Sequence, residues 1–424
     1  MLVDRRGEAR PELRGVPGEL PKAKGGKAQV NDASDYTTHE MVLNMGPSHP
    51  ATHGIIRMLA TLDGERVRDV DIQVGYLHRA FEKMSESIRW QQVFPYTDRL
   101  NYVSPLMNNV GYAMAVEKLL GIDVPERTQY IRMIACEISR LCDHLTCVGP
   151  GAMELGAFTA FLYCIEARDW LWDLIERQTG ARVTPAYVRI GGLAADVDDD
   201  YCANVGKVLD KIQPLIDDID KLLTGNQVFL DRMKGIGVLS AADAIDLGLT
   251  GPLLRAAGVR HDLRKARPYM FYDRVDFDVP IGTSGDNYDR YLVRMEEMRQ
   301  SVRILRQLIA DVPEGPINVE NTGIVLPEKR DVYETIEGAA NHFMLILDGI
   351  KVPAGEAYCA TEAANGELGF YVVSDGSGRP LKCRVRGPSF VHMQALKFMV
   401  MGSLLSDVVP TFGMLNMIGG ECDR

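Results

Sequence analysis

The chain has 424 residues, of which 46% are hydrophobic and 25% are charged, a balance that is ordinary for a soluble globular protein. This length allows two or three domains, or one large helical core with appended lobes. The formal net charge of −11 argues against a nucleic-acid partner and gives no electrostatic reason for binding to anionic lipid.

Residues 1–37 are expected to form a flexible N-terminal extension. They are polar, mixed in charge and rich in Gly and Pro, and they lack the apolar core of a signal peptide. No apolar run in the chain approaches the length of a membrane span, about 20 residues. If the protein works at a membrane, we expect other chains to hold it there.

Residues 38–76 predict a small antiparallel sheet. Short β-like segments at Met41–Leu43 and Ile55–Leu62 flank a loop, the turn Asp63–Glu65 follows, and Val67–Val74 alternates as a returning strand. We therefore expect the loop between the first two segments to lie at one end of this sheet.

Residues 77–424 are dominated by helical patterns and predict a large bundle core. Apolar residues recur at helical spacing in Leu77–Gln92, Pro105–Leu120, Pro125–Cys147, Gly156–Gln178, Val205–Leu223 and Tyr288–Ala310. In the last of these segments, Arg294 and Glu297 are expected on the surface. Residues 234–285, rich in Gly, Pro and charge, are interpreted as an insertion packed on the bundle.

Residues 331–424 are expected to form a mixed lobe. Its expected elements are strands at Phe343–Leu347, Gly369–Val373 and Lys382–Val385, a hairpin turn at Asp375–Gly378 and a helix at Ser389–Val409. The predicted fold class is therefore α+β, with a helical bundle core, an N-terminal antiparallel sheet and a small C-terminal β/α lobe.

The eight cysteines include no C-x-x-C pair, and neither a tetrahedral metal site nor a disulfide framework is expected. We expect most of them to be buried small apolar residues. No phosphate-cradling glycine loop follows a strand, so the chain is expected to bind no nucleotide of its own.

The loop Gly46–Gly54 contains two imidazoles, His49 and His53, with Pro50 between them. Pro50 lacks a backbone N–H, so this stretch is not an ordinary helical turn. Histidine can exchange protons near neutral pH or ligate a metal, and no nearby Cys pair or His-Glu-x-x-His helix supplies further ligands. Proton delivery is the favoured functional interpretation. The alternative is that both rings satisfy loop backbone groups.

Two further parts of the sequence, one segment and one single residue, contain candidate functional side chains. The segment Tyr96–Tyr102 is either a surface connector in which Asp98 and Arg99 pair in solvent, or a cavity wall whose phenol binds a carbonyl and offers it a proton. Glu154 lies in an apolar break between two hydrophobic helices, so its carboxylate should reach solvent or meet a cation.

Four motifs occur in order along the chain, at Gly46–Gly54, Gly75–Lys83, Asp98–Tyr102 and Gly420–Arg424. Together they closely resemble the D subunit of respiratory complex I, the quinone-site subunit of NADH:quinone oxidoreductase. That family is itself similar to the large subunit of nickel–iron hydrogenases. The likeness runs from about Glu40 to the last residue and implies a hydrogenase-large-subunit-like fold.

The resemblance implies roles for individual positions. His53 and Tyr102 match the histidine and tyrosine that contact the quinone headgroup, with His49 in the same quinone-binding set. Glu154 stands where the family commonly has an aspartate that partners this histidine. His53, Tyr102 and Glu154 are therefore the expected catalytic residues, with quinone as the substrate.

The resemblance also implies partners. Arg79 matches an arginine beside the terminal iron–sulfur cluster, which an adjacent subunit holds, so this chain alone is expected to bind no cofactor and no metal. Thr184 stands where many members have a histidine that tunes this cluster, which predicts a weaker pH dependence of the cluster potential. The implied partners are the cluster-bearing subunit, the C-type subunit and the membrane-embedded quinone-channel subunit. The implied location is peripheral, on the cytoplasmic face of the bacterial inner membrane.

Two rival functions stay open from the sequence. A nickel–iron site needs two C-x-x-C pairs, but the early position reads Leu77-His78-Arg79-Ala80 and the late one retains only Cys422. A scaffold subunit that docks an iron–sulfur partner to a membrane arm would need no catalytic side chains. NADH is the family's usual electron donor, and ferredoxin or a deazaflavin serves some relatives.

Overall fold

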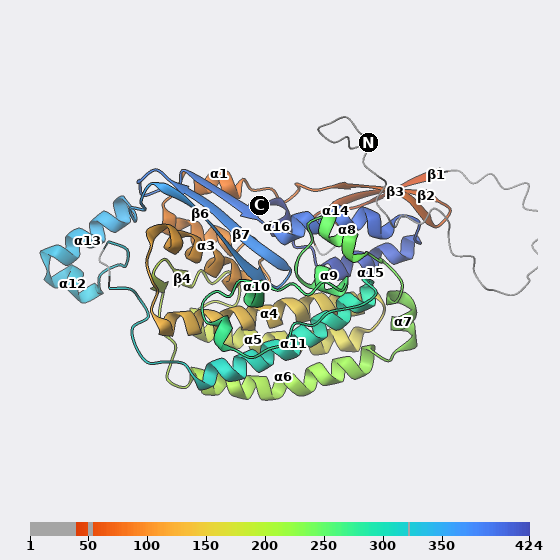
Figure 1. The fold of residues 1–424 in the computed structure, drawn as a ribbon, viewed down its shortest axis with the longest axis horizontal. Coiled ribbons are helices and arrows are strands. Elements are labelled where there is room, and N and C mark those ends of the chain that lie inside the picture. Colours follow the sequence, from red (N-terminus) through yellow and green to blue (C-terminus); the bar gives the residue numbers. More distant parts are fainter. Residues whose placement is uncertain (1–39, 50–53, 321–322) are drawn as a thin grey trace, which may run out of the picture.

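The computed structural model describes residues 40–49, 54–320 and 323–424 (Figure 1). Its helices, in chain order, are α1 (Phe81–Ser85), α2 (Phe94–Thr97), α3 (Pro105–Leu120), α4 (Glu126–Glu154), α5 (Phe158–Thr179), α6 (Tyr201–Leu223), α7 (Gln227–Met233), α8 (Ala241–Asp246), α9 (Gly251–Ala256), α10 (Leu263–Ala266), α11 (Asn287–Ala310), α12 (Lys329–Glu334), α13 (Ile336–Leu347), α14 (Pro388–Val400), α15 (Leu405–Leu415) and α16 (Gly419–Asp423). Short 3₁₀ helices occur at Trp90–Val93 and Tyr272–Arg274.

The strands form small antiparallel sheets, so the fold class is α+β. The strands are β1 (Glu40–Met45), β2 (Arg57–Asp63), β3 (Arg66–Gln73), β4 (Val188–Arg189), β5 (Gly192–Leu193), β6 (Gly355–Ala363), β7 (Gly366–Ser374) and β8 (Lys382–Arg386). They pair in the orders β1-β2-β3, β4-β5 and β6-β7-β8.

The long helices α4, α5, α6 and α11 lie side by side and form the largest layer of the molecule (Figure 1). Within this group α4 packs against α5 and α11, and it also faces the rest of the fold, where it packs against α3 and α15 (Figure 1). The apolar spacing of these segments, read from the sequence, predicted them, and each begins within four residues of its expected start. α4 continues past the expected end at Cys147 to Glu154, with Pro150 inside it.

The two three-stranded sheets belong to two different hydrophobic clusters. The β6-β7-β8 sheet packs on α3 and joins the main cluster of the bundle. In the other sheet, β2 alternates buried and half-buried residues, as a strand with one covered face must. Its buried face, at Met58, Ala60 and Leu62, packs with α14 and α15 in the second cluster.

Three expected elements are wrong in type or extent. Phe343–Leu347 is not a strand but the end of α13, an exposed helix that begins at an N-cap where Thr335 Oγ1 accepts from the Gly338 N–H. The expected helix Leu77–Gln92 reduces to α1 because Ala80, at φ +55°, starts the helix late. The expected helix Ser389–Val409 divides into α14 and α15.

The break between α14 and α15 has a tertiary cause. The Gly402 N–H donates to the Val67 carbonyl at 2.8 Å, and the Val67 N–H donates to the Ser403 carbonyl at 2.9 Å. These bonds attach the chain to β3, and Gly402 lies in the left-handed region at φ +79°. Among the described residues, no helix combines the length and apolarity that crossing a bilayer requires.

Candidate functional site

Segments that are far apart in the sequence meet at one place, here named the convergence site. It consists of Gly75–Arg79, Asp98–Tyr102 and the C-terminal segment Asn416–Arg424, next to Gly54 at the end of the histidine loop. A Cβ placed on Gly54 would lie 3.2 Å from the Met417 methyl carbon and 3.5 Å from the Gly419 nitrogen. The end of the histidine loop therefore packs directly on the C-terminal segment.

Asp423 fixes the Gly75–Arg79 segment. Its carboxylate oxygens accept the backbone N–H groups of Gly75 at 2.9 Å and Leu77 at 2.7 Å. The ring of His78 lies with Nδ1 2.7 Å from the Asp423 carbonyl oxygen. Because a carbonyl oxygen only accepts, Nδ1 of His78 carries the proton of this hydrogen bond.

Arg79 projects from this segment beside the Tyr102 loop. Its Nη2 donates to the Arg99 carbonyl at 2.5 Å. Partial burial and the neighbouring Arg99 guanidinium lower the pKa of Arg79, whereas Tyr102 and Asp423 raise it. The guanidinium ordinarily keeps its charge in proteins, so this side chain is a fixed cation at the site.

Tyr102 presents a partly exposed phenol, with 38% of the residue accessible. Burial raises the pKa of this phenol, the Arg79 cation opposes the shift, and the Asp143 carboxylate adds to it. The phenol is therefore protonated at neutral pH and can donate a hydrogen bond to a bound acceptor.

Asp98 is not part of a surface ion pair, so the interpretation in which it pairs with Arg99 in solvent is wrong. Asp98 is fully buried and accepts from Asn109 Nδ2 at 2.6 Å and from the Ala186 N–H at 2.8 Å. Burial raises the pKa of this carboxyl to about 6. Arg99 is exposed and its guanidinium donates to the Pro95 carbonyl.

The bond from Ala186 to Asp98 brings Thr184 near the convergence site. Thr184 and Ala186 both lie in the left-handed region, at φ +54° and +42°. Since a β-branched residue rarely adopts this conformation, the segment is held in place by its contacts rather than by its own preference. Thr184 has no imidazole to offer at this place.

Glu154 ends α4 and lies half-buried where α15 crosses it. A Cβ on Gly413 of α15 would stand 2.9 Å from Glu154 Oε2. His49 is half-buried at the edge of the described part of its loop. His53 lies outside the described residues, so its expected pairing with Glu154 and its contact with substrate stay predictions.

A buried ionic network behind the site was missed from the sequence. Glu297 lies between His144, whose Nε2 is 2.8 Å away, and Arg255, whose Nε donates at 2.7 Å. Arg255 Nη1 in turn donates to Glu362 at 2.7 Å. Arg294 and Glu297 are therefore buried, not on the surface as expected. Charged residues in the middle of otherwise apolar helices were the available signal.

Six of the eight cysteines are buried, in line with the expectation that most of them are buried small apolar residues. The thiols of Cys136, Cys142, Cys147, Cys164, Cys383 and Cys422 are buried, and burial raises the pKa of each. Among the residues that the structure describes, no three His, Cys, Asp or Glu side chains gather as metal ligands.

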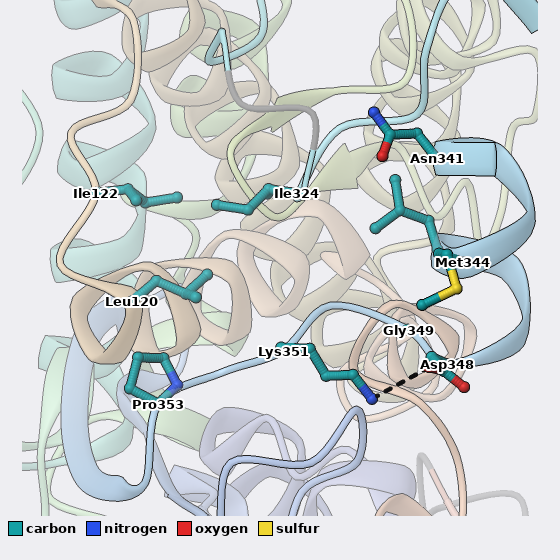
Figure 2. A pocket seen from close by; sticks show the side chains of 11 residues that line it. Leu120, Ile122, Ile324, Asn341, Met344, Asp348, Gly349, Lys351 and Pro353 are labelled. Atoms are coloured by element: carbon teal, nitrogen blue, oxygen red, sulfur yellow. Dashed lines mark ion pairs between the residues drawn. The ribbon is translucent and has the colours of Figure 1, made fainter. Parts of the chain in front are cut away.

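Two cavities flank α13, and neither includes a residue of the convergence site. The one in Figure 2 has a volume of about 330 Å³, with apolar walls from Leu120, Ile122 and Ile324 and a Lys351–Asp348 ion pair of 3.5 Å at its rim. The other, of about 490 Å³, lies between α13 and Arg89 and Arg189.

Comparisons with known proteins give consistent results. The family model described as respiratory-chain NADH dehydrogenase, 49 kDa subunit, matches residues 154–424. The chain is 55% identical to D subunit 2 of the NADH-quinone oxidoreductase of Anaeromyxobacter sp. (strain Fw109-5), over 98% of this chain and 97% of the relative. It is 54% identical to the D subunit of the same enzyme from Myxococcus xanthus (strain DK1622), over 91% and 93%. It is 51% identical to the C/D subunit from Bdellovibrio bacteriovorus (strain ATCC 15356 / DSM 50701 / NCIMB 9529 / HD100), over 90% and 68%.

Proposed function

Since the chain belongs to the family of the 49 kDa subunit of respiratory-chain NADH dehydrogenase, whose bacterial members are named D subunits of NADH-quinone oxidoreductase, we propose that it forms the quinone-reduction site of that enzyme. The observation that carries the proposal is the convergence site. It places a protonated, partly exposed phenol beside a fixed cation, at the point where segments from both ends of the chain meet.

Tyr102 would bind one quinone carbonyl. Its phenol donates a hydrogen bond to the oxygen and supplies the proton as negative charge develops there during reduction. The Arg79 cation lowers the pKa of the phenol, so it also favours the phenolate that remains after proton transfer. The electrons would be supplied by an iron–sulfur cluster held in an adjacent subunit.

His53 and Glu154 would serve the other carbonyl. In this proposal His53 binds the second oxygen, and Glu154 orients His53 and favours its protonated form. His49, four positions before His53 in the same loop, completes the quinone-binding set. Loss of the His53 positive charge is then one signal that could pass to proton-pumping subunits. Quinone turnover without proton translocation in a His53→Ala variant supports this step, and unchanged pumping excludes it.

The sequence resemblance to hydrogenase large subunits would give the convergence site a structural meaning. By that resemblance, the early and late C-x-x-C positions of those proteins would correspond to Leu77–Ala80 and to the segment around Cys422. In this chain the two meet through Asp423 and Leu77, and Cys422 is a buried thiol with a raised pKa. We infer that a former metal pocket now serves an organic substrate. Stoichiometric nickel in the purified protein would contradict this inference.

The proposed partners are other complex I subunits. The relative from Bdellovibrio bacteriovorus, whose name joins C and D, supports a C-type neighbour. Exposed apolar side chains near the site, Tyr76 at 46% and Val183 at 48%, support a protein partner that covers this face, which we propose is the cluster-bearing subunit. A membrane-embedded subunit would deliver quinone, with this chain peripheral at the cytoplasmic face of the bacterial inner membrane.

The test of the proposed function is Tyr102→Phe in membranes that contain the assembled complex. Assembly is checked by native gel and reduction of the terminal cluster by EPR. We expect assembly and cluster reduction to persist while quinone turnover falls by at least about tenfold, because the proton donor is gone. The matched control is Tyr333→Phe, a residue of α12 that is 79% exposed and distant in sequence.

Either result of this test decides between two functions. Turnover that collapses only in Tyr102→Phe places the phenol in the quinone site. Turnover that is unchanged shows that the hydroxyl is dispensable and favours a scaffold subunit, which would tolerate loss of the side chain. The control variant should match the wild type in both cases.

A further inference from the structure

A fully buried carboxylate, Asp143 of α4, lies directly behind the Tyr102 loop. Its Oδ2 accepts from Asn101 Nδ2 at 2.7 Å and from Ser104 Oγ at 2.8 Å. Its Oδ1 accepts from Asn416 Nδ2 at 2.6 Å. All three partners donate, which is the pattern that suits a carboxylate, and all three are neutral.

Two of these donors flank Tyr102 in the sequence. Asn101 precedes the tyrosine, and Ser104 follows it by two positions. The same Asn101 side chain accepts, through Oδ1, from the backbone N–H groups of Val103 at 3.1 Å and Ser104 at 3.3 Å. The side-chain amide of Asn101 therefore fixes the backbone that follows Tyr102, and Asp143 in turn holds this amide by a hydrogen bond.

The third donor belongs to the opposite wall of the convergence site. Asn416 ends α15 in the left-handed conformation, at φ +53°, and is the first residue of the C-terminal segment. Its Nδ2 also donates to Asn365 Oδ1 at 2.5 Å. Asp143 thus connects the Tyr102 loop to the C-terminal segment through one side chain.

No Lys, Arg or His side chain among the described residues lies within ion-pairing distance of Asp143. Its neighbour His144 turns to Glu297 instead. A buried carboxylate with only neutral donors is costly to keep, and its net contribution to stability is small. The hydrogen bonds of Asp143 are therefore better explained by the segments that they hold in place than by a contribution to the free energy of unfolding.

We propose that Asp143 is a positioning residue for quinone reduction, which fixes the Tyr102 phenol and the C-terminal segment in the relative placement that the substrate needs. This inference rests on the proposed function. In addition, the negative charge of Asp143 helps to keep the Tyr102 proton in place until it is transferred.

The test exchanges the two partners. Asn101→Asp places two carboxylates next to each other, with no donor between them. Asp143→Asn replaces the carboxylate that accepts from Asn101 and Asn416 by a third amide. The double variant Asn101→Asp/Asp143→Asn restores one carboxylate and one amide with the donor and acceptor reversed. All three are compared in membranes with the assembled complex, measuring kcat and KM for decylubiquinone, with cluster reduction followed by EPR.

We expect each single variant to lose about tenfold or more in kcat/KM while the terminal cluster still reduces, and the double variant to recover to within about threefold of the wild type. Ser104→Ala removes one donor without changing charge, and we expect it to raise KM more than it lowers kcat. The matched control is Asp289→Asn. Asp289 is a buried carboxylate whose Oδ2 accepts only backbone N–H groups, from Thr283 at 2.7 Å, Ser284 at 2.5 Å and Gly285 at 3.3 Å, and it touches no part of the convergence site. This variant should keep the wild-type kcat and KM.

Wild-type kinetics in both single variants would overturn the positioning role. So would a double variant that is as impaired as the singles, because a purely local hydrogen-bond reversal would then fail to restore function. If the single variants do not assemble, recovery of assembly and turnover in the double variant supports the proposal, and its absence contradicts it. Tyr102→Phe separates the two levels. If quinone turnover collapses in Tyr102→Phe while the Asp143 variants keep wild-type turnover, the positioning role alone is refuted. If Tyr102→Phe itself keeps normal turnover, the proposed function of the site is refuted.

Discussion

Gly420 lies so close to Arg99 that a Cβ on residue 420 would overlap the Arg99 carbonyl oxygen. The Leu100 carbonyl oxygen would be 2.6 Å from the same Cβ. The C-terminal segment therefore touches the Tyr102 loop backbone to backbone, with no side chain between them.

Gly420→Ala is expected to push these two segments apart. Because the contacts are to backbone atoms, no side chain can turn away to make room, and we expect a loss of about 1–3 kcal/mol in the free energy of unfolding. Quinone turnover should fall in parallel. Thermal denaturation of the purified chain and turnover in membranes are the two measurements.

Gly225→Ala is the matched control for that substitution. A Cβ at Gly225 meets no atom within 4 Å, and its φ lies outside the left-handed region. We expect unchanged or slightly raised stability. Equal losses in the two variants would contradict the steric explanation.

Glu421→Gln is expected to flatten the dependence of stability on pH. Burial, opposed by a hydrogen bond from Ser389, raises the pKa of Glu421 from 4.5 to about 7. The folded state therefore holds this proton more tightly than the unfolded chain does, so its contribution is fully present below pH 4.5 and is lost as pH rises to about 7.

The wild-type chain should accordingly lose stability between pH 5 and 8 on the order of 2–3 kcal/mol more than the variant does. Thermal or urea unfolding at four pH values in this range measures the difference. Parallel pH profiles for the two proteins would show that Glu421 does not titrate there.

Thr184→His tests the expectation that residue 184 influences the iron–sulfur cluster that we propose lies in an adjacent subunit. At φ +54° a histidine is better tolerated than a β-branched threonine, so folding should not suffer. We expect the wild-type complex to show weak pH dependence of the cluster potential and the variant to show a stronger one, since an imidazole titrates near neutral pH. EPR-monitored redox titration at several pH values decides this, and a strong dependence already in the wild type would contradict it.

Arg255→Met should strongly destabilise the fold, because this arginine is fully buried among carboxylates. Arg255 is the shared cation of Glu297 and Glu362, both at 2.7 Å, and of Asp262 at 3.7 Å, so its loss leaves three buried carboxylates without this partner. We expect a cost of about 3–5 kcal/mol and poor accumulation of the chain. The control is Arg330→Met, which removes an exposed pair with Glu334 and should cost less than about 1 kcal/mol.

The parts of the fold with local signals were predictable from the sequence. α3 was placed by Pro105 at its start and Gly121 at its end, and Gly121 does adopt φ +66° and donate to the Glu117 carbonyl. The hairpins β2-β3 and β7-β8 carried turn residues between alternating segments. These features depend on residues that are close together in the chain.

The elements that were predicted wrongly depend on contacts with distant residues, or on a hydrophobic pattern longer than the stretch on which the prediction was based. The Gly75–Arg79 segment is held by the distant Asp423, whose carboxylate accepts the Leu77 N–H, and Ala80 lies at φ +55°, so the helix begins only at Phe81. No local pattern shows these constraints. In α13, the apolar run Phe343–Leu347 reads as a strand, and helical spacing appears only when Ile336 is included.

For the candidate site, the sequence selected residues but not their arrangement, and the roles of these residues toward quinone stay predictions. The motif resemblance selected Arg79 and Tyr102, and the structure brings their segments together through the Arg79 bond to the Arg99 carbonyl. Asp143 was not selected, because one Asp in an apolar helix does not reveal which loop it will hold. A surface position for Asp98 stayed open as one alternative because its partners, Asn109 and Ala186, belong to other parts of the chain.

The bond between Leu77 and Asp423 joins residues that are 346 positions apart. Closing so long a loop is entropically costly and becomes favourable only after the intervening elements have packed. The helical layer, built from contacts nearer in sequence, should therefore acquire its protection from hydrogen exchange first. The proposed substrate-binding surfaces would be completed last. An incompletely folded chain would therefore contain the native helices but no formed quinone site.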